Sequence, residues 1–417
     1  MSERPLAIVT LVGFALLAVS GCASRGAGDW ASVRELTPAF LIGENASDGS
    51  LAADRYGHVA LTWVTGDASG QDLWLALSAD SGLTFTPPVR VNPRHGSVYS
   101  RPECRPIAAL GPAGELLMAW SERRADSTSV ADLAIRASAD GGRTLGPAVI
   151  VNDDADDGRP TFHGYASLTP LPNGDWFAVW MDSREHAHEA EMQSASLFYA
   201  LSSDGGQSWS DNRLLSGRAC ASCRVTALAD STGLIAVAYR SVAGGMRDPT
   251  LVITRNRGLT VAADTVLAPD HWRLDMCPVD GPALTMDHAG GGHIAWHSGA
   301  GAGGTWLAPW RAETGIAGLR RSLADSLVGA GHPRLARLGE ATLVTLEGST
   351  HADSGRSVIV VRALEPDGTL TPWLLLGTDA RDAAVAAAGD RAALVCWTEG
   401  AERGTRIRLV RLTPHER

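Results

Sequence analysis

Three cysteines in the middle of the chain have the spacing of a soft-metal site or of a disulfide. Cys220 and Cys223 form a C-x-x-C pair, and Cys277 follows at a distance. Two cysteines at this spacing together with a third can bind a soft cation. In an exported chain, which meets an oxidising compartment, two of them can instead form a disulfide. A redox pair is the third interpretation, although the pair does not stand on the strand-to-helix turn that lowers thiol pKa values.

Haem attachment is disfavoured, because Arg224 stands where the C-x-x-C-H signature needs histidine. Cys396 precedes Trp397 inside an apolar strand and is interpreted as a buried free thiol. Beyond the candidate cation at Cys220, Cys223 and Cys277, the sequence indicates no cofactor. The chain has no lysine, which excludes Schiff-base chemistry and the lysine of a phosphate-binding loop.

A strand repeat positions these cysteines. An apolar strand, usually ending in an aromatic residue, recurs every 50 to 60 residues, at Trp63, Trp120, Trp180, Tyr239, Trp296, Leu346 and Trp397. Each follows a turn that carries Gly or Asp, so each unit contains a strand, a turn and a second strand. Cys104, Cys220, Cys223 and Cys277 stand at or just before the first strand of a unit. Equivalent positions of adjacent units converge near a common axis, so we expect Cys220 or Cys223 close to Cys277.

A second repeat is the turn pattern S-x-D-x-G-x-[ST]-[WF]. It occurs at 78–85, at 138–145 without the final aromatic residue, and at 202–209, with a degenerate copy around Gly258. Glycine supplies the positive φ that such a turn needs, and Asp and Ser side chains satisfy backbone donors. A strand leads into each full copy, and Phe85 or Trp209 is expected to hold the turn against the sheet.

Together the repeats predict an all-β fold, a β-propeller of four-stranded blades, with seven blades favoured and six as the alternative. The last unit, from Ala383 to Leu412, has room for only three strands. The segment Pro38–Glu44 resembles the missing fourth strand, and pairing it with the C-terminal strands would close the ring and remove exposed edges. The predicted organisation is a signal peptide at 1–21, a tether at 22–36 and a propeller at 37–413.

The N-terminus resembles a bacterial lipoprotein signal. Arg4 is followed by an apolar run and then by Ser20-Gly21-Cys22, a small-residue stretch before a cysteine. The resemblance implies that Cys22 is lipidated, and Ala23 after it favours the outer membrane in a cell with two membranes. An ordinary signal peptide or an uncleaved anchor is the alternative. The formal net charge of −10 argues against nucleic acid as a partner.

The turns, with strands such as Leu116–Trp120, resemble the sialidase-like propellers that carry Asp-box repeats. That family holds a substrate carboxylate with three arginines, a role for which guanidinium groups are well suited. The stretch from Arg105 to Leu110 is similar to the family's Arg-Ile-Pro motif with Pro and Ile exchanged, and Arg224 and Arg334 also precede inner strands. The resemblance further implies a tyrosine nucleophile late in the chain, yet none of the five tyrosines lies in the C-terminal third.

Two functions follow from this resemblance. The first is a lipid-anchored, monomeric propeller of the cell envelope that binds a glycan or protein ligand at its axial face without catalysis. The second is an exo-acting glycosidase that uses Arg105, Arg224 and Arg334 with an acid such as Asp126 or Asp280. Tyr239 is the candidate nucleophile of the second, and its alternative interpretation is a core or wall residue. The absence of a late tyrosine favours the first.

Overall fold

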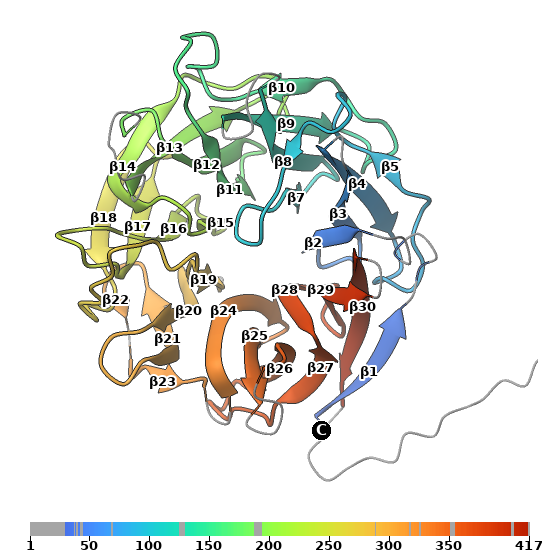
Figure 1. Cartoon of the computed structure of the whole chain (residues 1–417), viewed down its shortest axis with the longest axis vertical. Coiled ribbons are helices and arrows are strands. Elements are labelled where there is room, and N and C mark those ends of the chain that lie inside the picture. The colour runs from blue at the N-terminus through green and yellow to red at the C-terminus, as the bar shows by residue number, and fades with distance from the viewer. Residues whose placement is uncertain are drawn as a thin grey trace, which may run out of the picture.

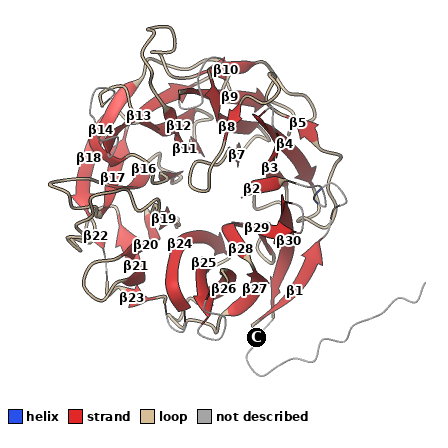
Figure 2. Cartoon of the chain, viewed as in Figure 1, coloured by secondary structure: helices blue, strands red, loops and turns tan. Residues whose placement is uncertain are grey.

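The computed structural model describes residues 30–36, 38, 41, 45–67, 70–124, 130–186, 194–287, 289–316, 318–324, 327–350, 355–401 and 404–415. These residues form strands, turns and loops and no α-helix (Figure 2). Consequently no helix in the described ranges is long and apolar enough to cross a membrane. The predicted signal peptide, Cys22 and Asp126 lie outside the described residues.

The strands surround a central axis as antiparallel sheets (Figure 1). In chain order they are β1 (Ala31–Leu36), β2 (Ala46–Ala53), β3 (Val59–Asp67), β4 (Gly70–Ser78), β5 (Val89–Arg90), β6 (Val98–Tyr99), β7 (Ile107–Leu110), β8 (Leu116–Arg123), β9 (Ala131–Ser138), β10 (Ala148–Ile150), β11 (His163–Pro170), β12 (Trp176–Asp182), β13 (Ser194–Ser202), β14 (Arg213–Cys220), β15 (Thr226–Ala229), β16 (Ile235–Arg240), β17 (Pro249–Arg255), β18 (Thr260–Val266), β19 (Ala283–Leu284), β20 (Gly291–Ser298), β21 (Gly304–Arg311), β22 (Gly315–Ile316), β23 (Arg321–Ser322), β24 (Leu327–Leu338), β25 (Ala341–Thr350), β26 (Val358–Leu364), β27 (Leu374–Thr378), β28 (Ala380–Ala387), β29 (Ala393–Ala401) and β30 (Gly404–Pro414).

Six sheets contain these strands, and the largest has nine. The short strand β6 joins two four-stranded groups in that large sheet, β2 to β5 and β7 to β10, by pairing with both β4 and β8. Dividing the sheet at β6 gives seven antiparallel units in the described chain. The prediction of an all-β propeller is confirmed, and the count of seven blades stays an interpretation that rests on this division.

The N- and C-terminal parts of the chain meet in one sheet, as predicted, but the strand involved is a different one. β1 pairs antiparallel with β30 from Ala31↔Pro414 to Leu36↔Leu409, so the range assigned to a tether contributes a strand. The expected segment Pro38–Glu44 is not that strand, and of it only Pro38 and Leu41 are described, joined by a turn hydrogen bond. Four of the six β1 residues are exposed. An outer strand of this kind pairs through its backbone and needs no apolar run, so the more apolar segment Pro38–Glu44 is not the closing strand.

The strand-end residues that define the repeat are core residues. Each lies in the second strand of its unit and is at most 2% exposed: Trp63, Trp120, Trp180, Tyr239, Trp296, Leu346 and Trp397. They pack between units, as where Trp180 and Trp176 of β12 share a cluster with Leu117 and Ala119 of β8. Burying a large aromatic ring contributes about 2 to 3 kcal/mol relative to leaving it exposed. These residues recur at a regular spacing in the sequence because each unit buries an equivalent residue against the neighbouring sheet.

The S-x-D-x-G-x-[ST] turns connect the third strand of a unit to the fourth. In the turn after β13, Ser202 Oγ accepts from Gly206 N at 2.8 Å, and Asp204 accepts from Ser208 N and from Ser208 Oγ. The turns after β4 and β9 repeat these bonds. Phe85 and Trp209 pack against the neighbouring core clusters, as expected. These turns stabilise the outer part of the units and lie away from the central axis.

Candidate functional site

The innermost strands of all seven units line one central channel. Its wall includes residues of β2, β7, β11, β15, β19, β24 and β28, mostly apolar. Glu103, Arg105, Arg224 and Arg334 also line it, and each lies before or within such a strand. Three of the arginines predicted from the family resemblance are therefore brought together, as expected, and Glu103 stands among them.

Glu103 is the electrostatic centre of this group. Arg224 Nη1 donates to Oε1 and Oε2 at 2.9 and 2.7 Å, and Arg334 Nη2 donates to Oε1 at 3.1 Å. His332 Nδ1 lies 3.2 Å from Oε1, and Gly281 N donates to Oε2 at 3.1 Å. Burial alone would raise the pKa of Glu103, but Arg224, Arg334 and His332 outweigh it and hold this pKa well below its usual range. A buried carboxylate with this many donors is a structural ion-pair centre.

Most donors of the three arginines are accordingly occupied by the protein itself, and Arg105 Nη2 is a buried donor without a hydrogen-bond partner among the described residues. Arg105 Nη1 donates to the carbonyl oxygens of Gly49, Asp382 and Ala383, and its Nε donates to that of Pro102. Arg334 Nε donates to the carbonyl of Ala383. A clamp for a substrate carboxylate needs paired guanidinium N–H donors that are hydrogen-bonded to water before the ligand binds and not to the protein. The contacts of Arg105, Arg224 and Arg334 instead tie several units together across the channel.

The two other candidates for glycosidase chemistry that the structure describes, Tyr239 and Asp280, are buried. Tyr239 is 0% exposed, with its hydroxyl 2.9 Å from Ser216 Oγ, and burial raises its pKa. This placement matches the core interpretation of Tyr239. Asp280 is 3% exposed, and its Oδ2 accepts from His332 N at 2.8 Å. Asp280 therefore lies beside the Glu103 group, whereas Tyr239 lies in the core between sheets.

The three cysteines meet, as the repeat predicted. Cys220 Sγ is 3.0 Å from Cys277 Sγ, and Cys223 Sγ is 3.5 Å from each of the other two. All five described cysteines are free thiols, including Cys104 and the buried Cys396. Hydrogen bonds from Cys220 and then Cys223 lower the pKa of Cys277, while burial raises that of Cys223. The sequence thus placed these side chains correctly relative to one another.

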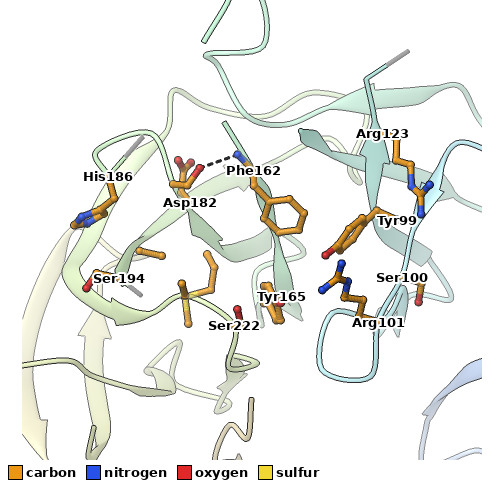
Figure 3. Close-up of a pocket in the computed structure, with 14 residues that line it drawn as sticks. Tyr99, Ser100, Arg101, Arg123, Phe162, Tyr165, Asp182, His186, Ser194 and Ser222 are labelled. Carbon is orange, nitrogen blue, oxygen red and sulfur yellow. Dashed lines mark hydrogen bonds between the residues drawn. The ribbon is translucent and has the colours of Figure 1, made fainter. Parts of the chain in front are cut away.

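A pocket of about 450 Å³ lies beside the cysteines, at the ends of strands of the second to fourth units (Figure 3). Tyr99 and Phe162 meet edge to face with their ring centroids 5.0 Å apart. The guanidinium carbons of Arg101 and Arg123 lie 5.2 and 5.6 Å from the centre of the Tyr99 ring. Tyr165 and His186 also line the pocket, His186 on the side away from Tyr99 in Figure 3. The pocket thus combines aromatic surface with two cations.

The only carboxylate among the described lining residues, Asp182, is already neutralised. Arg184 lies 2.8 Å from it, and the buried His163 lies 3.4 Å from it and 3.0 Å from Asp154. His163 Nδ1 donates to the carbonyl of Ala131, so its other nitrogen faces the two carboxylates. Burial alone would lower the pKa of His163, but its bonds to Asp154 and Asp182 raise it to about 9. The pocket therefore keeps the positive charge of Arg101 and Arg123.

Sequence reasoning missed Glu103 and the whole Tyr99 pocket. Glu103 precedes Cys104 and Arg105 in a stretch already singled out, but a single acid carries no spacing signal. Tyr99, Phe162 and His186 come from three segments that only the fold assembles. A usable signal was present at Arg123, because it is the last residue of β8 and closes the stretch Ser121-Glu122-Arg123 after the strand-end Trp120.

No known family model matches the chain, and no curated protein matches its sequence. Solved structures do match it. An ulvan lyase of a polysaccharide lyase family, solved bound to -[GlcA(1-4)Rha3S]-, is 13% identical with a TM-score of 0.55, covering 90% of this chain and 95% of its own. A protein of unknown function from Dyadobacter fermentans is 13% identical with a TM-score of 0.52, over 89% of this chain and 95% of its own.

A variant of the NanB sialidase from Streptococcus pneumoniae is 8% identical with a TM-score of 0.50, over 91% of this chain and 94% of its own. Identities this low establish common architecture and leave the chemistry to be argued from the site. The chain shares its fold with sialidase-like and polysaccharide lyase propellers.

Proposed function

We propose that this protein is an envelope-anchored propeller that binds an acidic carbohydrate in the Tyr99 pocket. The observation that carries the proposal is the pair of guanidinium groups beside the Tyr99 ring, in a chain whose net charge is −10. Aromatic faces pack against the apolar faces of sugar rings, and guanidinium groups recognise carboxylates and sulfates with paired hydrogen bonds. A positive, aromatic pocket in an acidic protein favours an anionic sugar over a neutral one.

A free donor in the pocket supports this proposal. Arg123 Nε is buried and has no hydrogen-bond partner among the described residues, and Arg123 Nη2 reaches Gln71 only at 3.4 Å. A buried donor without a partner is costly, by about 1 to 3 kcal/mol. Because Nε has almost no accessible surface, a ligand carboxylate or sulfate would satisfy it by drawing the Arg123 guanidinium group toward the pocket. The saccharide -[GlcA(1-4)Rha3S]- in the ulvan lyase structure is a ligand of this chemical class.

The experiment is a titration by calorimetry with uronic-acid oligosaccharides and with neutral oligosaccharides of the same length. We expect binding of the acidic series only, weakened by added salt. Arg101→Ala and Arg123→Ala should each weaken it about 10- to 100-fold, the equivalent of one charge-assisted contact. Arg143→Ala is the matched control, since Arg143 is exposed in the peripheral turn after β9. Equal affinity for both series, or equal loss in Arg143→Ala, would refute the proposal.

Glycoside hydrolysis is the alternative that the family resemblance implies. The internal contacts of Arg105, Arg224 and Arg334 and the burial of Tyr239 weigh against it. A fluorogenic sialoside panel tests it directly. Turnover that Arg105→Ala abolishes, in a variant that still folds, would replace the binding proposal with an enzymatic one.

The anchor rests on the N-terminal sequence alone, where the apolar run ends at Ser20-Gly21-Cys22. Lipidation at Cys22 would hold the propeller at the outer membrane and leave the Tyr99 pocket accessible. Metabolic labelling with a fatty-acid analogue should label the wild-type chain and leave Cys22→Ser unlabelled. Label retained by Cys22→Ser would exclude this anchor.

A further inference from the structure

Three sulfur atoms in the fourth and fifth units lie within contact distance of one another. The separations of Cys220, Cys223 and Cys277 Sγ are 3.0, 3.5 and 3.5 Å, and Cys220 and Cys223 are fully buried. None of these separations is a disulfide bond, which measures about 2.05 Å. A disulfide would join two of the sulfurs and leave the third without a bonding partner. A cation can use all three.

We propose that Cys220, Cys223 and Cys277 form a binding site for one thiophilic cation, with Zn²⁺ the best match. Zinc sites are built from cysteine thiolates, and a C-x-x-C pair with a distant third cysteine is a usual ligand spacing. The centre of a triangle with these edges is closer to each sulfur than the zinc–sulfur bond length of about 2.3 Å. The ion would therefore lie to one side of the three sulfurs, which leaves a fourth, tetrahedral position for a water or another ligand.

The surroundings balance the charge of such a site. Three thiolates and Zn²⁺ carry a net charge of −1, and the buried Arg247 Nη1 lies 3.1 Å from Cys220 Sγ. Arg247 is held in place by its Nε, which donates to the carbonyl of Leu274 at 2.9 Å. Val279 N lies 3.4 Å from Cys277 Sγ, a contact that suits a thiolate acceptor. Binding displaces the thiol protons to solvent, so cation affinity should rise with pH.

The site is adjacent to the Tyr99 pocket, although it does not depend on what that pocket binds. Ala221 and Ser222, the two residues between Cys220 and Cys223, line the pocket. A bound cation would fix this loop by tying both of its ends to Cys277. The cation site therefore has a structural role that can be measured without any carbohydrate.

The test begins with the metal content of the protein purified under reducing conditions and then incubated with Zn²⁺. We expect one equivalent per chain, a higher melting temperature than after chelation, and a sulfur-to-metal charge-transfer band when Co²⁺ replaces Zn²⁺. Cys277→Ser, at the least buried of the three positions, should lose the band and at least 100-fold in Zn²⁺ affinity. Cys396→Ala is the control, since it removes a buried thiol far from the site in β29.

Two results would overturn the proposal. One is Zn²⁺ bound equally well by Cys277→Ser and by wild type, which would place the ion elsewhere. The other is the wild-type protein, fully reduced, binding no Zn²⁺ or Co²⁺, with mass analysis of the oxidised protein showing a disulfide among these cysteines. Because the second experiment uses the wild-type chain, a misfolded variant cannot hide the answer.

Discussion

Arg224 of the fourth unit donates from a single nitrogen to both carboxylate oxygens of Glu103 in the second unit, at 2.9 and 2.7 Å. The pair joins residues that are 121 positions apart in the chain. Arg334, in β24 of a further unit, donates to the same carboxylate. The Glu103 side chain, 1% exposed, thus links three units across the central channel.

Removing this charge should destabilise the protein strongly. Glu103→Gln leaves the guanidinium groups of Arg224 and Arg334 buried without a counter-ion, and breaking a buried pair in this way costs about 3 to 5 kcal/mol. The control is Asp287→Asn, since its partner Arg311 is 47% exposed in its side chain. That substitution should cost less than about 1 kcal/mol. Urea unfolding at pH 7 measures both, and similar small losses would contradict the role of Glu103.

Stability should decrease as the pH rises through the neutral and mildly alkaline range. The folded protein raises the pKa of His163 to about 9, as bonds to Asp154 and Asp182 outweigh burial. His332 has the same pKa of about 9, because its bond to Glu103 outweighs burial. The unfolded value is about 6.5. The contribution of each histidine is therefore complete below about pH 6.5 and is lost as the pH rises to the folded value.

This contribution amounts to roughly 3 kcal/mol at most for the buried His163, and to less for His332, whose side chain is 35% exposed and screened by solvent. Unfolding free energies measured between pH 6 and pH 9.5 should fall steadily. His163→Gln should lower stability near pH 6 and flatten part of the decline. His58→Gln is the control, because the His58 side chain is 56% exposed. A wild-type stability that stays constant across this range would contradict the protonated state of both histidines.

Local and periodic signals were sufficient for the fold and for the thiols. The residues from Trp63 to Trp397 occupy equivalent places in second strands, so burial repeats with the unit and is visible in the sequence. The same equivalence predicts that Cys220 or Cys223 lies close to Cys277, and both do. Repeats make distant positions comparable, and equivalent positions at the first strands of adjacent units lie near one another because those strands line the central channel.

Features without a periodic signal were not predictable. β1 has four exposed residues out of six and pairs through its backbone, so its sequence carries little of the pattern of a buried strand. Glu103 is recognised only when Arg224 and Arg334 are placed beside it. The Tyr99 pocket combines segments from three units whose loops differ in length and composition. Such sites depend on long-range packing, which a single sequence does not record.

Two adjacent glycines in the turn after β13 should respond differently to the same substitution. Gly205 and Gly206 both have positive φ, 75° and 87°, so alanine is strained at either position by about 1 kcal/mol. A Cβ at Gly205 would meet nothing within 4 Å, whereas one at Gly206 would lie 2.8 Å from Leu117 Cδ2. Gly206→Ala should therefore cost about 1 to 3 kcal/mol more than Gly205→Ala.

Thermal unfolding of the two glycine variants gives the comparison directly, because each serves as the control for backbone strain in the other. A larger loss in Gly205→Ala would show that the turn does not pack on β8 as described. The comparison tests how the turn between β13 and β14 packs on Leu117, and it needs no ligand.

The last prediction separates binding from catalysis at Tyr99. Burial, and then Cys104, raise the pKa of this phenol, so it stays protonated at neutral pH and offers a ring rather than a base. Tyr99→Phe keeps the ring, so the affinity for acidic oligosaccharides should change by no more than about twofold. That change in binding free energy is smaller than the loss of one aromatic stacking contact. Tyr99→Ala removes the ring on which Arg101 and Arg123 rest, and should weaken binding about tenfold. If instead an acidic polysaccharide is cleaved by the wild type and not by Tyr99→Phe, the hydroxyl takes part in a reaction, and the pocket is an active site.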